Sequence, residues 1–336
     1  MENIKNHPAP DQLDSFDKYP PYYGQDLELA YTPQRSVFTL WAPTASKTRL
    51  NIYSSGEGGN PEEQLEMEPS DDGTWRIAVE RDLNGSFYTF QIEKEGKWLA
   101  ETPGIWAKAV GINGDRAAVI DWNQTNPEGW ESDRAPELKM YSDIILYELH
   151  HRDFSIAPDS GIRNKGKFLA LTETGTKTPE GQASGLDHLK ELGVTHIHIL
   201  PSFDYATVDE TRLADKTYNW GYDPKNYNVP EGSYSTDPAN PVTRIREFKE
   251  MVKSLHRNGM RVVLDVVSTT RPRSTVRTST LPSPVTFTAR MPTVPTRTPR
   301  AAAMRRLRNA KWYGITSSNP SNSGRRSTIS TDSGST

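Results

Sequence analysis

The composition of the chain changes abruptly between Val267 and Ser268, and this change limits what the chain can fold into. The last 69 residues hold 12 of the chain's 40 Lys and Arg but only one of its 43 Asp and Glu. They consist largely of Ser, Thr, Pro and Arg, whereas the part up to Val267 is acidic and rich in aromatic residues. So few apolar residues cannot bury enough surface to offset the entropy of ordering. We therefore predict a disordered tail over residues 268–336.

The bulk composition excludes several classes of protein. The 336 residues include no Cys, so disulfides and thiolate metal sites are excluded. No stretch approaches 18 consecutive apolar residues, which argues against a membrane span. The N-terminus lacks the apolar core of a signal peptide. We expect a soluble cytoplasmic protein.

The first part of the chain has the pattern of an antiparallel β-sandwich. Residues 1–26 are rich in Pro and Tyr and are predicted to be an extended lead-in. Between residues 27 and 125, short alternating runs such as residues 36–41 are separated by turn sequences such as Asn84-Gly85. Strands and turns at this spacing favour a small sandwich over residues 27–125.

After a predicted linker over residues 126–140, the pattern changes to alternating strands and helices within residues 141–267. Residues 144–149 form a continuous apolar run, which predicts a strand. A short helix over residues 186–192 and a β-branched strand over residues 194–201 follow.

A longer helix is predicted to start at Pro241 and to end before Gly259, which suits the position after a helix C-terminus. Its apolar residues recur on one face: Val242, Ile245, Phe248, Val252 and Leu255. The run 262–267 follows as a third strand. Two strand-helix-strand units predict a parallel α/β sheet or barrel.

The strongest motif is the heptapeptide 218–224, Tyr-Asn-Trp-Gly-Tyr-Asp-Pro. Three aromatic residues beside Asp223 suit sugar recognition, because aromatic faces stack on pyranose rings and a carboxylate accepts hydrogen bonds from hydroxyl groups. A structural loop pinned by buried aromatics explains the same residues equally well.

With other segments, this motif carries a family resemblance. The chain resembles the α-amylase clan of glycoside hydrolases, most closely the type I pullulanases, which cut α-1,6 branch bonds. The matching segments span nearly all of residues 22–267: 22–27 and 38–45 resemble the family's starch-associated β-sandwich, 147–155 and 198–205 its first two barrel strands, 218–224 a signature of debranching enzymes, and 263–267 the first conserved segment of the clan.

The resemblance implies that residues 141–267 are about three strands of a (β/α)8 TIM barrel, with the site at the C-terminal strand ends. By the same resemblance, Tyr222 stacks on glucose at the cleavage subsite with Asp223 nearby. Asp265 positions the site through an Arg that the family supplies further along the chain. The implied partner is an α-glucan such as pullulan, glycogen or limit dextrin, with no cofactor.

Further residues are weaker candidates for substrate binding. Trp220 belongs to the heptapeptide, and His150 and Asp153 follow the first predicted barrel strand, although loop packing explains the latter two equally well. In the sandwich, indole rings could serve as a glucan platform or as core residues: Trp41, Trp75, Trp98 and Trp106.

No metal site is expected. Asp209, Glu210 and Asp215 form a mixed acidic loop, which we interpret as solvated surface. His196 and His198 lie on one side of a predicted strand with no third ligand at a convincing spacing, which favours core histidines.

The chain departs from the family after the third strand. Retaining glycosidases need a nucleophile and an acid/base carboxyl group. The family places its nucleophile Asp after strand four and its acid/base Glu after strand five, so no catalytic residue is present. Ser268-Thr269-Thr270 stands where the family has Tyr-Asn-His. We predict an inactive fragment of a debranching enzyme, and as an alternative a non-catalytic α-glucan-binding fragment.

A shifted reading frame explains the tail better than a linker or a basic nucleic-acid-binding arm. Linkers begin at domain ends rather than after the third of eight strands, and the Arg residues are scattered outside any fold. Read one base out of frame, residues 284–298 admit Gly-Tyr-Phe-Tyr-Arg-Gln-Asn-Ala-Asp-Gly-Thr-Tyr-Ser-Asn. Residues 327–336 admit Tyr-His-Ile-Asp-Gly-Phe-Arg-Phe-Asp, which resembles the family's fourth strand and ends on the nucleophile. Thr270-Arg271 cannot encode the family's His in this register, so the junction would hold a second change.

Overall fold

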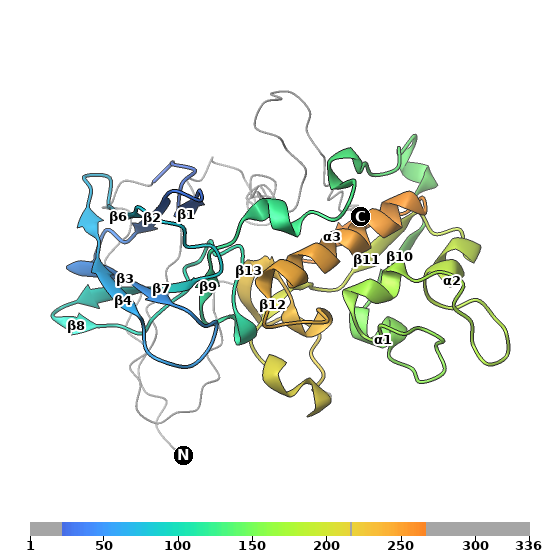
Figure 1. Ribbon diagram of the computed structural model, residues 1–336. Helices are drawn as coiled ribbons and strands as arrows, with labels where there is room; N and C mark the ends of the chain where they lie inside the picture. The colour runs from blue at the N-terminus through green and yellow to red at the C-terminus, as the bar shows by residue number, and fades with distance from the viewer. Residues whose placement is uncertain (1–21, 216, 267–336) are drawn as a thin grey trace, which may run out of the picture.

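The computed structural model describes residues 22–215 and 217–266. The predictions for most of the N-terminal lead-in and for the tail over residues 268–336 lie outside these described residues. Within them, Figure 1 shows a β-sandwich at one end and an α/β unit at the other, with a short two-stranded ribbon between them.

The N-terminal domain is an antiparallel β-sandwich, as the sequence predicts. Its first sheet has the order β1-β2-β6-β5 and its second the order β4-β3-β7-β8, with β9 also paired to β7. The strands are β1 (Glu28–Tyr31), β2 (Ser36–Trp41), β3 (Lys47–Tyr53), β4 (Glu63–Glu66), β5 (Glu68–Pro69), β6 (Thr74–Val79), β7 (Phe87–Lys94), β8 (Lys97–Trp98) and β9 (Ala117–Ala118).

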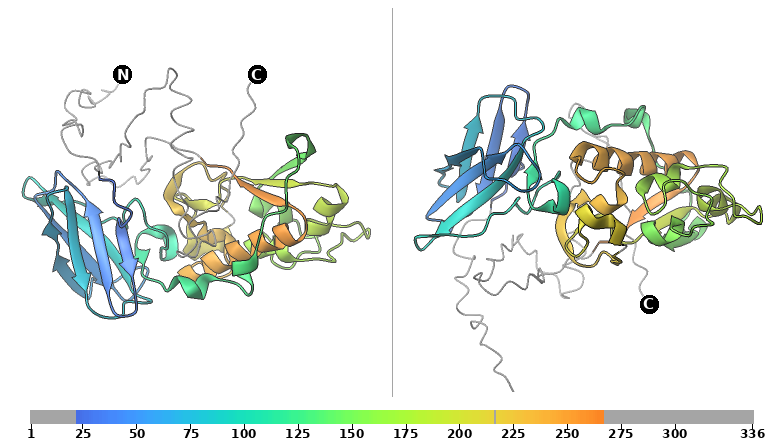
Figure 2. Two further views of the ribbon diagram at one scale, coloured as in Figure 1. Left: turned by 90° about the horizontal axis from the view of Figure 1, so that it is seen from above. Right: turned by 60° about the horizontal axis from the view of Figure 1, so that its bottom comes forward.

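Side chains from both sheets meet in one apolar core. Phe38 of β2 and Phe90 of β7 are fully buried. The Tyr88 ring packs edge-on against both, with centroids 4.9 Å from Phe38 and 5.5 Å from Phe90. Edge-to-face aromatic packing adds to the stability that burial already provides. Each sheet therefore covers the apolar face of the other, and Figure 2 shows the two sheets lying face to face.

The α/β unit is built on three parallel strands in the order β10-β11-β14. These are β10 (Leu146–Leu149), β11 (His196–Ile199) and β14 (Arg261–Leu264), and the helices are α1 (His151–Ser155), α2 (Gly185–Glu191) and α3 (Pro241–Arg257). Three parallel strands joined by helical crossovers are the beginning of a (β/α)8 barrel.

Helix α3 begins and ends where the sequence predicts. The Asn240 side chain caps it by accepting hydrogen bonds from the backbone N–H groups of Val242 and Thr243, at 3.0 and 3.2 Å. Pro241 occupies the first turn, and Gly259 follows the helix with φ 80°. The predicted face packs inward, with Ile245, Phe248 and Leu255 buried.

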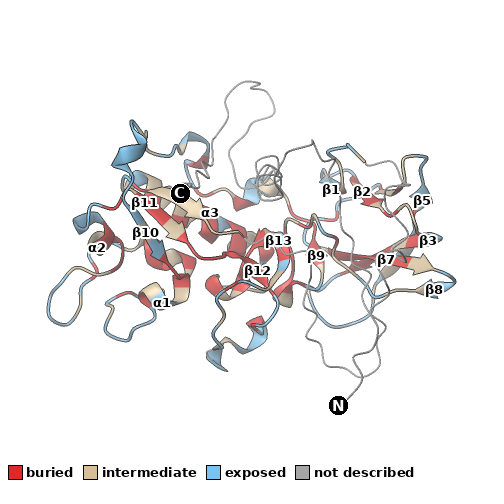
Figure 3. Ribbon diagram, turned by 180° about the vertical axis from the view of Figure 1, so that it is seen from behind, coloured by how far each residue is buried: buried red, intermediate tan, exposed pale blue. Residues whose placement is uncertain are grey.

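The first parallel strand is shorter than the apolar run predicts. Ile144 and Ile145 precede β10, and their exposed fractions are 36% and 53%. A strand inside a closed barrel has neighbours on both sides, whereas β10 pairs only with β11 in the described residues. Much of β10 is accordingly coloured as exposed in Figure 3.

An unpredicted two-stranded ribbon stands between the two domains. Strand β12 (Phe203–Tyr205) pairs antiparallel with β13 (Pro224–Pro230), with register shifts at each step. Figures 1 and 2 both place this ribbon between the sandwich and the parallel sheet. Residues 206–215 and 217–223, which include the heptapeptide up to Asp223, belong to the loop that the ribbon carries, and Pro224 begins β13.

Short 3₁₀ helices occur at η3 (Ile112–Gly114), η4 (Trp122–Thr125), η5 (Trp130–Ser132), η6 (Tyr141–Asp143), η7 (Phe168–Thr172), η8 (Glu210–Asp215) and η9 (Gly232–Tyr234).

The predicted linker region lies along α3. One face of α3 holds the segment 124–133 through a row of basic side chains: Arg246 to the Gln124 carbonyl, Lys249 to Thr125 Oγ1, Lys253 to the Glu128 carbonyl and His256 to Asp133. The chain between the domains is thus held against the α/β unit by these hydrogen bonds.

None of the helices in the described residues combines the length and apolarity that crossing a bilayer requires.

Candidate functional site

The backbone conformation of the heptapeptide loop depends on Gly221 and Asn219. Gly221 has φ 87°, and a Cβ there would lie 2.8 Å from both the Cβ and the carbonyl oxygen of Pro201. Asn219 Oδ1 accepts a hydrogen bond from the Gly221 N–H at 2.7 Å, and Asn219 Nδ2 donates to Asp223 Oδ1 at 2.8 Å. An Asn side chain that bonds to the backbone two residues on is a common way to stabilise a turn. The carboxamide of Asn219 therefore fixes the positions of the two residues around Tyr222.

Tyr222 and Asp265 meet at the C-terminal ends of the strands. The Tyr222 hydroxyl donates to Asp265 Oδ2 at 2.6 Å, although 43 residues separate them. This hydrogen bond, together with partial burial and the negative charge of Asp265, raises the pKa of Tyr222 to about 12. The ring of Tyr222 is 45% exposed. Asp265 itself directly follows β14, and its backbone N–H donates to the Ile199 carbonyl of β11.

The other two aromatic residues of the loop are also exposed. Trp220 is 59% exposed and Tyr218 40% exposed, and their rings meet edge to face with centroids 5.6 Å apart. None of the three aromatic rings of this motif is buried among the described residues. In the described residues, Asp223 Oδ2 is buried and has no hydrogen-bond partner. The exposed aromatic faces of the loop can stack on a sugar ring.

His150 lies behind the loop and supports it. Its Nε2 is 2.9 Å from the Asn219 carbonyl oxygen and 2.9 Å from the Tyr234 hydroxyl. Because a carbonyl oxygen only accepts, Nε2 carries the proton, and Nδ1 is then free to accept from the Asp153 N–H at 3.4 Å. His150 is buried, so its visible role in this structure is to hold the backbone of the heptapeptide.

The two histidines of β11 have different surroundings. His196 is buried, and burial, followed by the charge of Arg261, lowers its pKa. This fits the predicted core histidine. His198 lies on the same side of the strand, but its Nδ1 is 3.2 Å from Oε2 of Glu148, whose side chain is exposed. The face that would line the inside of a barrel thus carries a His–carboxylate contact.

The prediction that the acidic loop is solvated surface is wrong for Glu210. Its carboxylate is buried, and Oε2 lies 2.7 Å from Arg244 Nη2. Arg244 has no exposed surface and also pairs with Asp204 at 3.0 Å. No local pattern indicates this partner, because Arg244 lies 34 residues away on α3. Asp215 does match the prediction, since it pairs with Arg212 at the surface.

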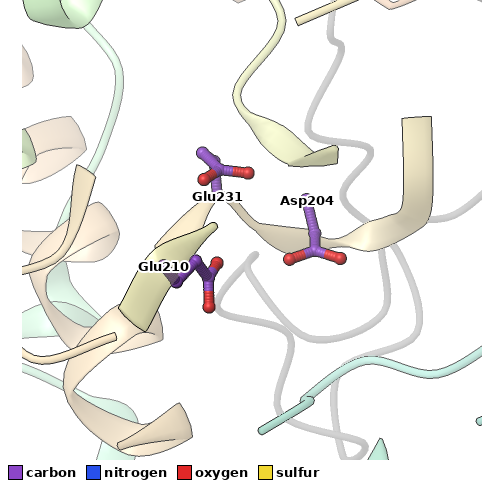
Figure 4. A group of neighbouring side chains, drawn as sticks. All are labelled: Asp204, Glu210 and Glu231. Carbon is purple, nitrogen blue, oxygen red and sulfur yellow. The ribbon is translucent and has the colours of Figure 1, made fainter. Parts of the chain in front are cut away.

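Glu231 completes a group of three buried carboxylates, whose oxygens converge in Figure 4. Burial raises the pKa of Glu231 well above its usual range, and the nearby charges of Asp204 and Glu210 raise it further. Its oxygens accept from the backbone N–H groups of Tyr205 and Ser233. Arg244 already supplies positive charge to the other two carboxylates, so the group is an ion-pair cluster around a guanidinium.

The tryptophans of the sandwich do not form a common platform. The register pairs Trp41 with Thr74 and Leu40 with Trp75, so Trp41 and Trp75 point to opposite faces of their sheet. Trp75 packs against the core and donates through its indole N–H to the Ala42 carbonyl at 3.0 Å. Trp98 belongs to the other sheet, and the Arg49 guanidinium covers its ring at 4.3 Å.

Known families and structures match both domains. Residues 26–108 match the model of carbohydrate-binding module 48 (isoamylase N-terminal domain), and residues 165–271 match the α-amylase catalytic domain. A pullulanase of Bacillus subtilis is 43% identical over 249 residues, which are 73% of this chain and 33% of that protein. The chloroplastic pullulanase 1 of Arabidopsis thaliana is 32% identical, over 73% of this chain and 29% of that one.

Solved structures give the same result. The apo pullulanase of Paenibacillus barengoltzii superposes with a TM-score of 0.72 at 50% identity, covering 75% of this chain and 39% of that one. The pullulanase of Bacillus acidopullulyticus gives a TM-score of 0.71 at 41% identity, covering 76% and 31%. The chain thus spans roughly a third of the length of each of these four proteins.

Proposed function

Since the chain belongs to the pullulanase-type branch of the α-amylase family and spans an N-terminal portion of it, we propose that its activity class is the hydrolysis of α-1,6-glucosidic bonds in pullulan, glycogen or limit dextrins. The observation that carries this proposal is the pairing of Tyr222 with Asp265 at the strand ends, beside the exposed ring of Trp220. Active sites of (β/α)8 enzymes lie at this edge of the sheet.

We propose further that the 336-residue chain does not hydrolyse glucans by itself. A retaining mechanism needs one carboxylate as nucleophile and a second carboxyl group as acid and base, about 5–5.5 Å apart and flanking the bond. The described residues provide three parallel strands of the barrel. In the family, the nucleophile follows the fourth barrel strand and the acid/base follows the fifth. The three convergent carboxylates cannot replace them, because they are buried and two of them are paired with Arg244.

Reducing ends released from pullulan test this directly. The purified chain should release none above a blank without protein, while the Bacillus subtilis pullulanase in the same buffer serves as the positive control. Release by the chain at a rate proportional to its concentration would show that a catalytic pair exists in it after all.

A second candidate function is non-catalytic binding of α-glucan. It is supported by three exposed aromatic rings in one loop, Tyr218, Trp220 and Tyr222. Affinity electrophoresis in a glycogen gel should retard the chain, and Trp220→Ala should migrate faster in glycogen than the wild type. Trp98→Ala is the matched control, because it removes an indole from the sandwich without touching the loop. If the wild type runs at the same speed with and without glycogen, this candidate is excluded.

A further inference from the structure

The position of the loop that carries Tyr222 depends on the two-stranded ribbon at its base. Residues 206–223 leave from β12 and return into β13, so these two short strands form the base of the loop. Their pairing is irregular, with register shifts on both sides of Asp204. A two-stranded ribbon is marginally stable by itself, and this one therefore depends on contacts with other elements.

Arg244 of α3 supplies the first set of such contacts. Its Nη1 lies 3.0 Å from Asp204 Oδ1 on β12 and 3.3 Å from the Pro230 carbonyl at the end of β13. Asn226 of β13 donates to the other oxygen of Asp204 at 2.7 Å. One fully buried guanidinium thus holds both strands of the ribbon against the α/β unit.

The sandwich domain supplies the second set. The Asn113 N–H donates to Glu210 Oε2 and the Glu210 N–H donates to Asn113 Oδ1, each at 2.7 Å. On β13, Asn226 Nδ2 donates to the Gly114 carbonyl at 2.9 Å, and Lys225 Nζ reaches Asp115 at 2.6 Å. Three successive residues of the sandwich domain therefore contact the ribbon or the loop above it.

The backbone at this junction is shaped for close approach. Asn113 has φ 58° and Gly114 has φ 69°, values that Asn and Gly tolerate better than other residues. A Cβ on Gly114 would lie 2.3 Å from Asp204 Oδ2 and 2.6 Å from Asn226 Nδ2. The sandwich backbone thus contacts the polar side chains that hold the ribbon, with no space for a larger residue.

We propose that the sandwich domain acts as a brace for the glucan-contacting loop, and that Asn113 and Gly114 are positioning residues that transmit this support to Tyr222 through Glu210, Asp204 and Asn226. This inference rests on the proposed function of the loop, but it assigns the sandwich a role other than binding sugar. This supporting role needs no sugar-binding platform on the sandwich, which agrees with the scattered positions of Trp41, Trp75 and Trp98. The contacts predict that loosening the junction frees the loop while the sandwich itself stays folded.

The test is Gly114→Ala in the full chain, with Gly96→Ala as matched control. Both glycines have positive φ, 69° and 74°, so both variants carry a similar backbone strain. The Cβ collides with the ribbon only at residue 114, because nothing lies within 4 Å of a Cβ at residue 96. Hydrogen exchange of residues 203–224, followed by mass spectrometry, should speed up by about tenfold in Gly114→Ala and stay unchanged in Gly96→Ala. Equal exchange of this segment in both variants and the wild type overturns the proposal.

Asn113→Gly covers the case in which Gly114→Ala does not fold. It keeps the backbone conformation accessible but removes the side chain that bonds to Glu210 and Asp209. We expect faster exchange in residues 203–224 and a fall of the Tyr222 pKa from about 12 toward the value of a free phenol, because the hydrogen bond to Asp265 is then less populated. Unchanged exchange together with an unchanged phenol titration contradicts the brace.

Maltotriose then separates the brace from the proposed function. Where the wild type binds this sugar, Gly114→Ala should weaken binding several-fold more than Gly96→Ala. Where the wild type does not bind it, glucan contact by this chain fails, while the exchange experiment still decides whether the sandwich supports the loop.

Discussion

The sandwich and the α/β unit differ in how completely they bury their apolar surfaces. In the sandwich, two sheets cover each other, and residues such as Phe38 and Phe90 have no exposed surface. In the α/β unit, Ile197 of β11 is equally buried under the helices, yet Leu146 of the neighbouring strand is 51% exposed. A parallel sheet is normally covered on both faces, and in the described residues this one is not. Among the described residues, the sandwich core is thus covered on both sides, whereas one face of the parallel sheet is left open.

The two domains also differ in whether their buried ionisable side chains have ionic partners. In the α/β unit, Arg244 pairs with Asp204 and Glu210 inside the protein. In the sandwich, Glu28 is buried with no partner for Oε2 among the described residues, and Oε1 accepts only from backbone N–H groups near Trp106. Burial raises the pKa of Glu28 to about 8. The sandwich therefore contains a buried carboxyl group without an ionic partner, and the α/β unit contains the paired cluster.

The largest expected effect comes from removing the cation of the paired cluster. Arg244→Met leaves Asp204, Glu210 and Glu231 buried without a counter-charge, and we expect a loss of up to about 5 kcal/mol of unfolding free energy. Urea unfolding followed by tryptophan fluorescence measures it. Arg246→Met on the same helix should stay within about 0.5 kcal/mol, because its guanidinium is at the surface. A similar loss in both variants would mean that Arg244 contributes no more than a surface residue.

The next effect compares the two apolar faces. Phe38→Ala removes a fully buried ring from the sandwich and should cost about 4 kcal/mol. Leu146→Ala on the open face should cost less than about 1 kcal/mol, because half of that side chain is already exposed. Thermal unfolding of both variants provides the comparison. A large loss for Leu146→Ala would show that this face is covered in solution.

A pH-dependent effect concerns Glu28. Its pKa is near 4.5 in the unfolded chain and about 8 in the fold, so the folded state binds the proton more tightly. The contribution of Glu28 to the stability of the wild type is therefore fully present below about pH 4.5 and is lost as the pH rises through about 8. Glu28→Gln does not titrate, so the difference in unfolding free energy in favour of this variant should grow over this window, to on the order of 5 kcal/mol at pH 9.

Urea unfolding of both proteins at pH 5, 7 and 9 measures this difference. Background titrations cancel in the comparison, because both proteins share every other group. A constant difference across the three values would mean that Glu28 finds a partner in solution.

The smallest effect concerns Tyr222. Tyr222→Phe removes the hydroxyl that bonds to Asp265, but the side chain is half exposed, so the unfolding free energy should change by less than about 1 kcal/mol. Ultraviolet titration should lose one phenol with a pKa of about 12. Loss of a phenol that titrates near 10 would show that the contact with Asp265 does not form.

Much of this architecture could be predicted from local sequence patterns. The sandwich could be predicted from signals such as the alternation in residues 36–41 and the Asn-Gly turn at residue 84. The two ends of α3 could be predicted from Asn240, Pro241 and Gly259. These signals act over a few residues, where turn, cap and periodicity rules apply.

The missed features depend on distant partners. Strand β12 has three residues and β13 begins and ends with Pro, so neither has the length or composition of a typical strand. Glu210 looked like surface because its partners, Asn113 and Arg244, lie 97 and 34 residues away. For Tyr222 and Asp265, family resemblance implied one site, and the structure adds their hydrogen bond.

If the heptapeptide loop contacts glucan and the sandwich only supports that loop, the two domains should respond differently to the loss of an aromatic ring. Calorimetric titration of maltotriose into the full chain tests this most directly, with Tyr222→Ala and Trp98→Ala compared under the same conditions. We expect saturable binding that Tyr222→Ala abolishes and Trp98→Ala leaves unchanged. Binding that survives Tyr222→Ala and disappears with Trp98→Ala would contradict it, and would place the sugar on the sandwich.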